Sequence, residues 1–247
     1  MIDFIDIHKA FGPKKVLQGA TLSVDRGQVM FIIGASGVGK SVLVKHLVGL
    51  LKPDQGQILL DGQDITHLTE EQFYPVRKRC AMVFQNSTLF DSMTLLDNVA
   101  LPIRKHQNVS IKEARVRARE KLALVNMENE GERYPADFGD GMRKKVAIAR
   151  ALTLSPEFVI FDEPTTGIDP ISANIVDRLI RDLSDRLGVT SIVVSHDLRS
   201  IFSVADRVAM LYQGKFVLDG PPDVYRTTDD PVVHQFINGL ADGPMQL

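Results

Sequence analysis

The residues of this sequence that are best suited to chemistry form a glycine-rich loop ending in a lysine and a serine. The loop matches the pattern Gly-x-x-x-x-Gly-Lys-Ser/Thr in full, follows the apolar run Val29–Ile33 and opens a predicted helix over Lys40–Leu51. Its glycines let backbone N–H groups turn toward phosphate oxygens, and the helix N-terminus adds its positive dipole end. Lys40 is expected to reach the β- and γ-phosphates, and the Ser41 hydroxyl to bind Mg²⁺. The predicted phosphate-binding loop is Gly34, Ala35, Ser36, Gly37, Val38, Gly39, Lys40 and Ser41.

Three further polar residues follow apolar runs that are typical of buried strands. Asp162 and Glu163 come after Phe158–Phe161, and His196 comes after Thr190–Val194. Alone, such acids are also typical of helix caps, and a lone histidine is usually structural. Because the carboxyl ends of parallel strands face a shared ligand crevice, the phosphate loop favours functional roles. We expect Asp162 to contact Mg²⁺, Glu163 to polarise the attacking water, and His196 to contact the γ-phosphate.

The elements that must position these side chains are also visible. Short continuous apolar runs alternate with helical stretches, which predicts an α/β fold with a largely parallel core sheet. The first 30 residues are expected to form strands, and the helix-rich stretch from about 86 to 155 an inserted subdomain. We interpret the charge run over 112–121 in that stretch as a solvated helix face. Another helix is predicted over Met142–Leu154, with small and apolar residues at helical spacing.

The composition excludes several classes of protein. A net charge of −2, from 29 basic and 31 acidic residues, argues against a surface that grips nucleic acid as a whole. The single cysteine, Cys80, excludes an internal disulfide and fits a reducing compartment. The acidic N-terminus lacks the features of a signal peptide, and no stretch has the apolar length of a membrane helix. We therefore expect a chain that reaches a membrane only through a partner.

Taken together with further motifs, these residues resemble the ATP-binding cassette family over nearly the whole chain. Phe11, with Val16 beside it, resembles the aromatic residue that stacks on adenine, and Gln85 resembles the glutamine of the family's glutamine loop. The run over 163–170 resembles the segment that leads from the catalytic glutamate to the loop crossing to a second subunit, with Asp169 as that loop's acid. The resemblance implies a P-loop cassette with an N-terminal antiparallel β subdomain and an inserted α-helical subdomain, binding ATP and Mg²⁺. Gln85 is then a further Mg²⁺ and water contact.

Such cassettes work in pairs, so the resemblance implies a second cassette, taken here as another copy of this chain. ATP is held between the phosphate loop of one copy and the signature loop of the other. Closing on ATP and opening after hydrolysis drive an integral-membrane permease. The whole chain, 1–247, is expected to form a single cassette with a C-terminal extension over about 221–247.

A narrower resemblance is to the MlaF-like ATPases, which power phospholipid movement between the bacterial inner and outer membranes. It rests on four segments: Val76–Arg79, Phe84–Asp91, Asp97–Arg104 and Asp230–Pro244. It implies a peripheral subunit on the cytoplasmic face of the inner membrane, with a permease, an Mce-type substrate-binding protein, a possible small regulatory subunit and no nucleic acid. In that branch the C-terminal tail can reach the neighbouring cassette, although an ordinary terminal helix is the alternative here.

The signature loop departs from the family's pattern, Leu-Ser-Gly-Gly-Gln or -Met. Here it reads Phe138-Gly139-Asp140-Gly141-Met142, so the serine hydroxyl is lost at Gly139 and a carboxylate is gained at Asp140. Two unit charges about 4 Å apart repel by about 4 kcal/mol at an effective dielectric constant near 20, which opposes a nearby γ-phosphate. We also expect Asp140, just before a helix, to cap the N–H groups that should meet the phosphate. The resemblance makes Gly139, Asp140 and Gly141 nucleotide contacts.

Three interpretations of this departure stay open. In the first, Arg143 or Lys144 neutralises Asp140, and hydrolysis persists at a slower rate. In the second, the chain pairs with a different cassette, which gives one competent and one poor site. In the third, the chain binds ATP and holds it without hydrolysis. Because the other catalytic residues are all present, we favour a working ATPase with weakened closure.

Two other functional classes are less favoured. A cassette that acts on DNA or the ribosome usually carries a coiled-coil insertion or two cassettes in one chain, and this sequence has neither. A small-molecule kinase would not explain the spacing of Gln85, the signature region and His196. The presence of permease and substrate-binding-protein genes beside its own would separate these classes.

Overall fold

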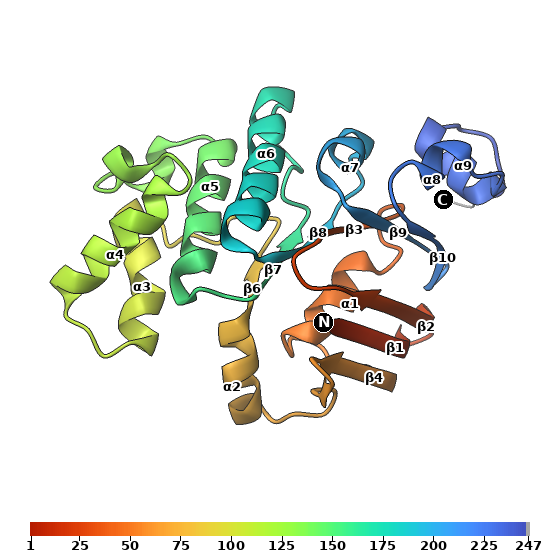
Figure 1. Cartoon of the computed structure of the whole chain (residues 1–247), viewed down its shortest axis with the longest axis horizontal. Coiled ribbons are helices and arrows are strands. Elements are labelled where there is room, and N and C mark those ends of the chain that lie inside the picture. The colour runs from red at the N-terminus through yellow and green to blue at the C-terminus, as the bar shows by residue number, and fades with distance from the viewer. Residues whose placement is uncertain (246–247) are drawn as a thin grey trace.

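Two β-sheets organise the chain in the computed structural model, which describes residues 1–245 (Figure 1). The first is antiparallel, in the order β2-β1-β4-β5, and consists of β1 (Ile2–Phe11), β2 (Lys14–Val24), β4 (Gln55–Leu60) and β5 (Gln63–Asp64). The second runs in the order β10-β9-β3-β8-β7-β6, and its neighbouring strands are parallel except in the β9–β10 hairpin. It consists of β3 (Val29–Ile33), β6 (Cys80–Val83), β7 (Phe158–Asp162), β8 (Thr190–Val194), β9 (Arg207–Tyr212) and β10 (Lys215–Gly220). The predicted α/β fold with a mainly parallel core sheet is confirmed.

Strand β3 lies within the core sheet and separates two apolar cores. All five of its residues are buried, because successive side chains of a strand point to opposite faces of a covered sheet. Val29, Phe31 and Ile33 belong to the core that the larger helices cover. Met30 and Ile32 belong to the core between this sheet, the first helix and the antiparallel sheet. The loop after β3 is therefore anchored from both sides.

Helices connect the parallel strands, and several of their ends follow local sequence signals. The first helix ends at Leu47, earlier than the predicted Leu51, because Gly49 adopts a left-handed conformation with φ 69°. The 3₁₀ turns are Glu128–Glu130, Pro135–Asp137 and Leu152–Leu154. Residues 246–247 of the predicted C-terminal extension lie outside the described part of the chain. The helices are α1 (Lys40–Leu47), α2 (Glu70–Arg79), α3 (Leu95–His106), α4 (Ile111–Ala123), α5 (Asp140–Ala151), α6 (Pro170–Leu187), α7 (Leu198–Val204), α8 (Val224–Thr227) and α9 (Pro231–Asn238).

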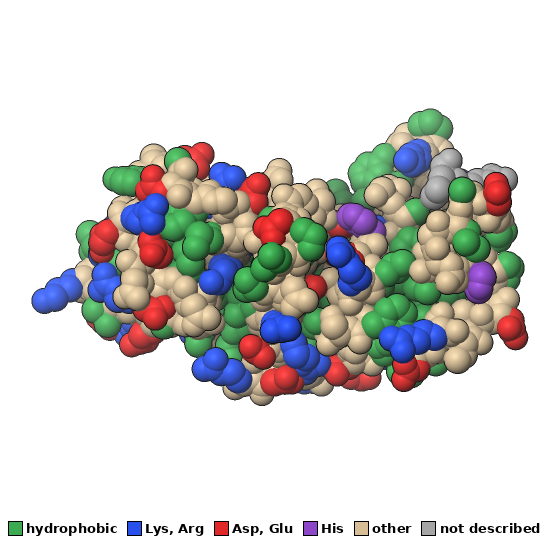
Figure 2. All heavy atoms as spheres, turned by 90° about the horizontal axis from the view of Figure 1, so that it is seen from above, with side chains coloured by type: hydrophobic (Ala, Val, Ile, Leu, Met, Phe, Trp, Pro, Cys, Tyr) green, Lys and Arg blue, Asp and Glu red, His purple; other side chains and the backbone are tan. Residues whose placement is uncertain are grey.

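Helices α3, α4 and α5 gather at one end of the molecule, while α8 and α9 lie at the other (Figure 1). Figure 2 shows basic and acidic side chains interspersed over the α3–α4 end. The predicted charge run falls on α4, where Ala114, Ala118 and Leu122 are buried and the intervening charged residues face solvent or lie half-buried. This pattern agrees with the interpretation of that run as a solvated helix face.

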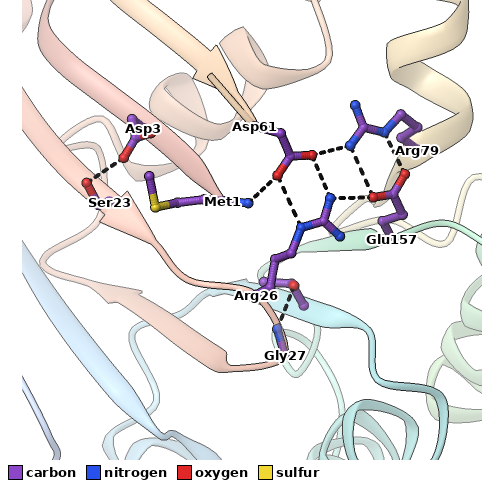
Figure 3. Close-up of polar contacts among 9 residues, drawn as sticks. Met1, Asp3, Ser23, Arg26, Gly27, Asp61, Arg79 and Glu157 are labelled. Carbon is purple, nitrogen blue, oxygen red and sulfur yellow. Dashed lines mark hydrogen bonds and ion pairs between the residues drawn. The ribbon is translucent and has the colours of Figure 1, made fainter. Parts of the chain in front are cut away.

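Four charged side chains tie the two sheets together. Figure 3 shows Arg26 and Arg79 alternating with Asp61 and Glu157. Arg26 Nη2 lies 2.6 Å from Glu157 Oε2 and Arg79 Nε lies 2.6 Å from Glu157 Oε1, while both guanidinium groups also bind Asp61. Asp61 follows β4, and the other three residues precede strands of the core sheet. The network thus links the antiparallel sheet to the strands that carry the candidate site.

Candidate functional site

The phosphate-binding loop runs from the end of β3 to the start of α1, and two of its glycines sit where no side chain fits. Gly34 has φ 143°, and a Cβ there would lie 2.3 Å from the Leu211 carbonyl oxygen. Gly39, the N-cap of α1, has φ 114°, and a Cβ would lie 2.8 Å from Val16 Cγ1. Because Gly39 has no side chain to cap the helix, the first N–H groups of α1 are left for another acceptor. The loop geometry suits an anion at the helix N-terminus.

Lys40 connects this loop to the acidic side of the site. Its ammonium donates to the carbonyl oxygens of Gly34 at 2.8 Å and Ala35 at 3.0 Å, and its Nζ lies 3.7 Å from Glu163 Oε1. The side chain is only 4% exposed, and this burial lowers the pKa of Lys40 despite the opposing charge of Glu163. A phosphate that entered the loop would give this cation a fully charged partner.

Ser41 and Asp162 meet where β7 ends. Ser41 Oγ donates a hydrogen bond to Asp162 Oδ1 over 2.5 Å. This hydroxyl and carboxylate, with the Gln85 amide lining the adjacent cavity, are the oxygen ligands that Mg²⁺ prefers beside phosphates and waters. Among residues 1–245, no group of three or more His, Cys, Asp and Glu side chains could hold a metal ion. The residues therefore fit a Mg²⁺ ion that arrives with a nucleotide.

Glu163 and His196 are brought together at the carboxyl ends of β7 and β8. His196 Nδ1 lies 2.7 Å from Glu163 Oε2, and Thr166 Oγ1 donates to the same oxygen at 2.8 Å. Glu163 has a positive φ of 56°, an uncommon conformation for a non-glycine residue, and its N–H donates to the Val194 carbonyl. Its carboxylate is 13% exposed, whereas His196 is 47% exposed. The geometry aims a sheltered carboxylate at a cavity that solvent can enter.

One cavity of about 460 Å³ collects most of the predicted site residues. Phe11 stands at its edge, 47% exposed, with Lys9 Nζ 5.6 Å from the ring centroid. Gly34, Val38 and Asp162 do not line it, and Asp162 reaches it only through Ser41. The predicted residues that line it are Phe11, Val16, Ser36, Gly37, Gly39, Lys40, Ser41, Gln85, Glu163 and His196.

Sequence reasoning missed three residues that line the same cavity: Lys14, Val42 and Thr166. Lys14 and Val42 lie close in sequence to residues that were predicted to contact the nucleotide, and this proximity could have predicted both. Thr166 lies within the recognised run over 163–170, but its bond to the Glu163 carboxylate has no local sequence pattern.

The signature region lies in a separate cavity of about 470 Å³, which Gly139, Asp140, Gly141 and Asp169 help to line. The phosphate loop does not contribute to this cavity. Asp140 also lines a cavity of about 410 Å³ with Gln85 and Thr166, but the phosphate loop is absent there too, so one chain does not bring the phosphate loop and the signature residues together. Asp169 is the N-cap of α6, and its carboxylate accepts from the N–H groups of Ile171 at 3.0 Å and Ser172 at 2.9 Å.

The predicted capping role of Asp140 is wrong. Gly139 is the N-cap of α5, Asp140 is the first helical residue, and no side chain caps this helix. The Asp140 carboxylate instead accepts from Arg143 Nη2 at 2.6 Å, because residues three apart on a helix share a face. The proposed neutralising contact thus falls to Arg143. Lys144 Nζ donates to the Glu163 and Thr166 carbonyl oxygens instead.

A family model described as ABC transporter matches residues 17–166. The chain belongs to the ABC transporter family. It is 37% identical over 245 residues to the intermembrane phospholipid transport system ATP-binding protein MlaF of Escherichia coli K12, covering 99% of this chain and 91% of the relative. MlaF of Haemophilus influenzae is 39% identical over 235 residues, with 95% and 89% covered. The probable ribonucleotide transport ATP-binding protein mkl of Mycobacterium tuberculosis H37Rv is 38% identical over 244 residues, with 99% and 68% covered.

Solved structures agree with this family assignment. The ATP-binding cassette MJ0796, a dimer in a post-hydrolysis state with ADP and Pi, matches with a TM-score of 0.82 and 27% identity, covering 90% of this chain and 99% of that one. The cbiO1 subunit of a Clostridium perfringens ABC transporter matches with a TM-score of 0.84 and 27% identity, with 97% and 95% covered. The chain is therefore an ATP-binding ATPase of this family. Within residues 1–245, no helix has both the length and the apolar character needed to cross a bilayer.

Proposed function

We propose that two copies of this chain bind two ATP molecules between them and couple ATP hydrolysis to movement of an integral-membrane permease. The observation that carries the proposal is the position of the Glu163 carboxylate. It lies between His196 and the Lys40 ammonium, in the cavity lined by the phosphate loop. In this arrangement Phe11 and Val16 hold the adenine, and the loop N–H groups bind the phosphates.

The hydrolytic step follows from these positions. A water molecule between Glu163 and the γ-phosphate donates a proton to the carboxylate as its oxygen attacks phosphorus. The bond to the β–γ bridging oxygen breaks, and ADP leaves with the electron pair. His196 contacts the γ-phosphate and keeps the Glu163 side chain oriented, while Lys40 balances charge on the leaving group. Ser41, Gln85 and Asp162 would hold a Mg²⁺ ion, which would supply further charge neutralisation.

The second copy is needed because one chain separates the two halves of the site. The signature cavity with Gly139, Asp140 and Gly141 is distinct from the phosphate-loop cavity, so the signature loop serves the nucleotide of the partner. Asp169 reaches the partner at the same interface. The stretch from about 86 to 155 forms a helical subdomain, and the loop that carries Gln85 meets the permease. The described part of the C-terminal extension, from about 221 to 245, reaches toward the neighbouring cassette.

We further propose that the transported cargo is phospholipid, moved between the inner and outer membranes. The names of the MlaF relatives support this cargo, and their coverage of nearly the whole chain extends the similarity beyond the nucleotide site. The partners are then a permease, an Mce-type substrate-binding protein and a small regulatory subunit, with the chain on the cytoplasmic face of the inner membrane. The name of the mkl relative makes ribonucleotide transport the competing cargo.

A second candidate function is a weakly hydrolysing or regulatory cassette in a heterodimer, which the Asp140 carboxylate favours. The ion pair between Arg143 and Asp140 supports the working enzyme instead, because it offsets the added negative charge within the same helical turn. Neighbouring genes that encode a second, intact cassette would support the heterodimer.

The cargo is tested with the complete transporter in vesicles that contain a fluorescent phospholipid. The expected result is ATP-dependent transfer of the lipid to acceptor membrane, lost in the complex that carries Glu163→Gln. ATP-dependent uptake of a labelled ribonucleotide with no lipid transfer would overturn the phospholipid assignment and leave the ATPase assignment intact.

A further inference from the structure

Helix α5 carries two cationic side chains whose hydrogen-bond partners are uncharged oxygens. Lys144 is 4% exposed, and its ammonium donates to the carbonyl oxygens of Glu163 at 3.2 Å and Thr166 at 3.0 Å. Arg150, six residues further along, donates to the Ser87 carbonyl at 3.2 Å, and to the Thr88 carbonyl and hydroxyl at 2.9 Å each. Both contacts fix pieces of backbone that flank the nucleotide cavity.

A buried ammonium normally pairs with a carboxylate, because removing an unpaired charge from water is costly. The nearby acids are engaged elsewhere: Asp140 binds Arg143, and the Glu163 carboxylate binds His196. Burial lowers the pKa of Lys144, and the charges of Asp140 and Glu163 oppose that effect. The Lys144 ammonium therefore fixes the positions of two main-chain oxygens instead of neutralising an acid.

The segment that Lys144 holds is the turn that aims the catalytic carboxylate. Glu163 has the left-handed φ of 56°, a conformation that surrounding contacts must maintain. Within the same turn, Thr166 Oγ1 donates to Glu163 Oε2. Lys144 thus binds the carbonyl oxygens of both residues whose side chains meet at the carboxylate, and it restrains the first and last residues of the turn together.

We propose that Lys144 is a positioning residue that couples the signature helix to Glu163 of the same subunit. The inference rests on the proposed function, in which the signature loop at the start of α5 contacts the nucleotide of the partner. Lys144 lies four residues after Asp140 on that rigid helix, so a displacement of the loop reaches the Glu163 turn directly. Nucleotide bound at one site then adjusts the attacking geometry at the other. Arg150 extends the same control to the loop that follows Gln85.

The first test compares Lys144→Met and Lys144→Arg with the unmodified protein in its complete transporter complex. We expect Lys144→Met to lower kcat by about tenfold or more, since a displacement of about 1 Å at a catalytic group has effects of this size. KM for ATP should stay within about twofold, and Lys144→Arg, which keeps the donors, should recover most of kcat. Lys121→Met on α4 is the matched control, because it removes a lysine outside the nucleotide cavity.

A double-mutant cycle separates positioning from general damage. Thr166→Val removes the hydroxyl that also holds the Glu163 carboxylate. If both residues position the same carboxylate, kcat of the double variant should be only slightly lower than that of the more impaired single variant. Arg143→Ala, which perturbs the signature loop on the same helix, should combine with Lys144→Met to less than the product of the two losses, because part of its effect reaches Glu163 through the lysine. If Lys144→Met does not fold, Lys144→Gln replaces it, with Lys144→Arg as the rescue.

The outcomes distinguish this inference from the proposed function. An unmodified complex without ATP turnover would overturn the proposed function itself. Turnover in the unmodified complex together with an unchanged kcat in Lys144→Met, or losses that multiply in the Thr166→Val cycle, would overturn the positioning role alone. A raised KM with normal kcat would also overturn it, because the lysine would then serve nucleotide binding.

Discussion

The phosphate-loop cavity and the signature cavity are built in opposite ways. In the first, side chains from different elements contact one another: Ser41 of α1 binds Asp162 of β7, and Glu163 after β7 contacts His196 after β8. In the second, Asp140 and Arg143 pair within one turn of one helix. The first region is thus fixed by the tertiary structure of a single chain, while the second has a local charge balance that a partner can alter.

This difference explains why the two regions tolerate change differently. In the phosphate loop, Gly34 lies against the Leu211 carbonyl oxygen, so a side chain there would displace the loop. By contrast, a Cβ at Gly139 would meet no atom within 4 Å, and Asp140 is 58% exposed. Gly139 and Asp140, which depart from the family pattern, are exposed to solvent in the single chain. We therefore expect them to destabilise only the closed pair with ATP bound, and not the single chain.

Among the substitutions that leave Glu163 in place, the largest effect is expected from Arg143→Ala, which leaves the Asp140 carboxylate uncompensated. Repulsion of about 4 kcal/mol at an effective dielectric near 20 is an upper guide, and we expect turnover in the complex to fall by roughly a hundredfold. ATP affinity of the isolated chain, measured with a fluorescent nucleotide, should not change. A loss of ATP affinity in the isolated chain would contradict the claim that the signature region does not contribute to nucleotide binding in its own subunit.

The next effect concerns Asp177, a buried acid on α6 that, unlike Glu163, forms no ion pair among residues 1–245. Ser200 Oγ donates to its Oδ2 at 2.5 Å, and Oδ1 has no hydrogen-bond partner within residues 1–245. Burial raises the pKa of Asp177 to about 6. Because this value exceeds that of the unfolded chain, the stabilisation from its proton is complete below about pH 4 and is lost as pH rises through about 6.

Asp177→Asn should therefore raise the free energy of unfolding at pH 8 by roughly 2 kcal/mol and change little at pH 4. The measurement is denaturant unfolding across that pH range, with Asp182→Asn on the exposed side of α6 as the control. An equal gain at both pH values would show that titration of Asp177 is not the cause.

A smaller gain is expected from the double change Gly139→Ser with Asp140→Gly, which restores the family's signature residues. Removing the carboxylate and adding a hydroxyl donor should raise turnover in the complex by about three- to tenfold, or about 1 kcal/mol. On this background Arg143→Ala should lose its effect, because its acidic partner is gone. No increase in turnover of the complete complex would contradict the interpretation that these two departures weaken closure on ATP.

The smallest effect is expected from Glu157→Gln in the network of Figure 3, which lies outside both regions. Hydrogen bonds from Arg79 and Arg26 lower the pKa of Glu157 to about 2, so its contribution is present above about pH 4.5 and is lost as pH falls through about 2. Because the side chain is 37% exposed, screening limits the loss at pH 7 to about 1 kcal/mol or less. High salt should reduce it further, and turnover should stay unchanged.

The sequence predicted the parts of this molecule in which local pattern and tertiary role coincide. Apolar runs such as Val29–Ile33 gave the core strands, because a strand covered on both faces needs no polar alternation. The loop before Lys40 was predictable because its glycines serve backbone geometry. The position after an apolar strand placed His196 beside it, and the family resemblance placed Gln85 there, in the cavity where the structure has both.

The remaining features depend on contacts between distant segments. Asp140 is a common helix-capping residue, yet it lies one position inside α5, so its carboxylate turns to Arg143. Lys144 was one of two candidates, with Arg143, to neutralise Asp140, but burial against the β7–α6 segment directs it to the Glu163 and Thr166 carbonyls. No spacing rule contains the left-handed backbone of Glu163, because only the surrounding structure maintains it.

The most direct test of this account is ATP turnover by the chain in complex with its own permease, measured beside the Glu163→Gln complex. We predict clear turnover that the substitution lowers by at least about a hundredfold, the range expected for loss of a general base, while ATP binding is retained. That result would mean that the pair works in spite of the Asp140 carboxylate. Turnover no higher than that of the Glu163→Gln complex would contradict the account and direct attention to a different partner cassette.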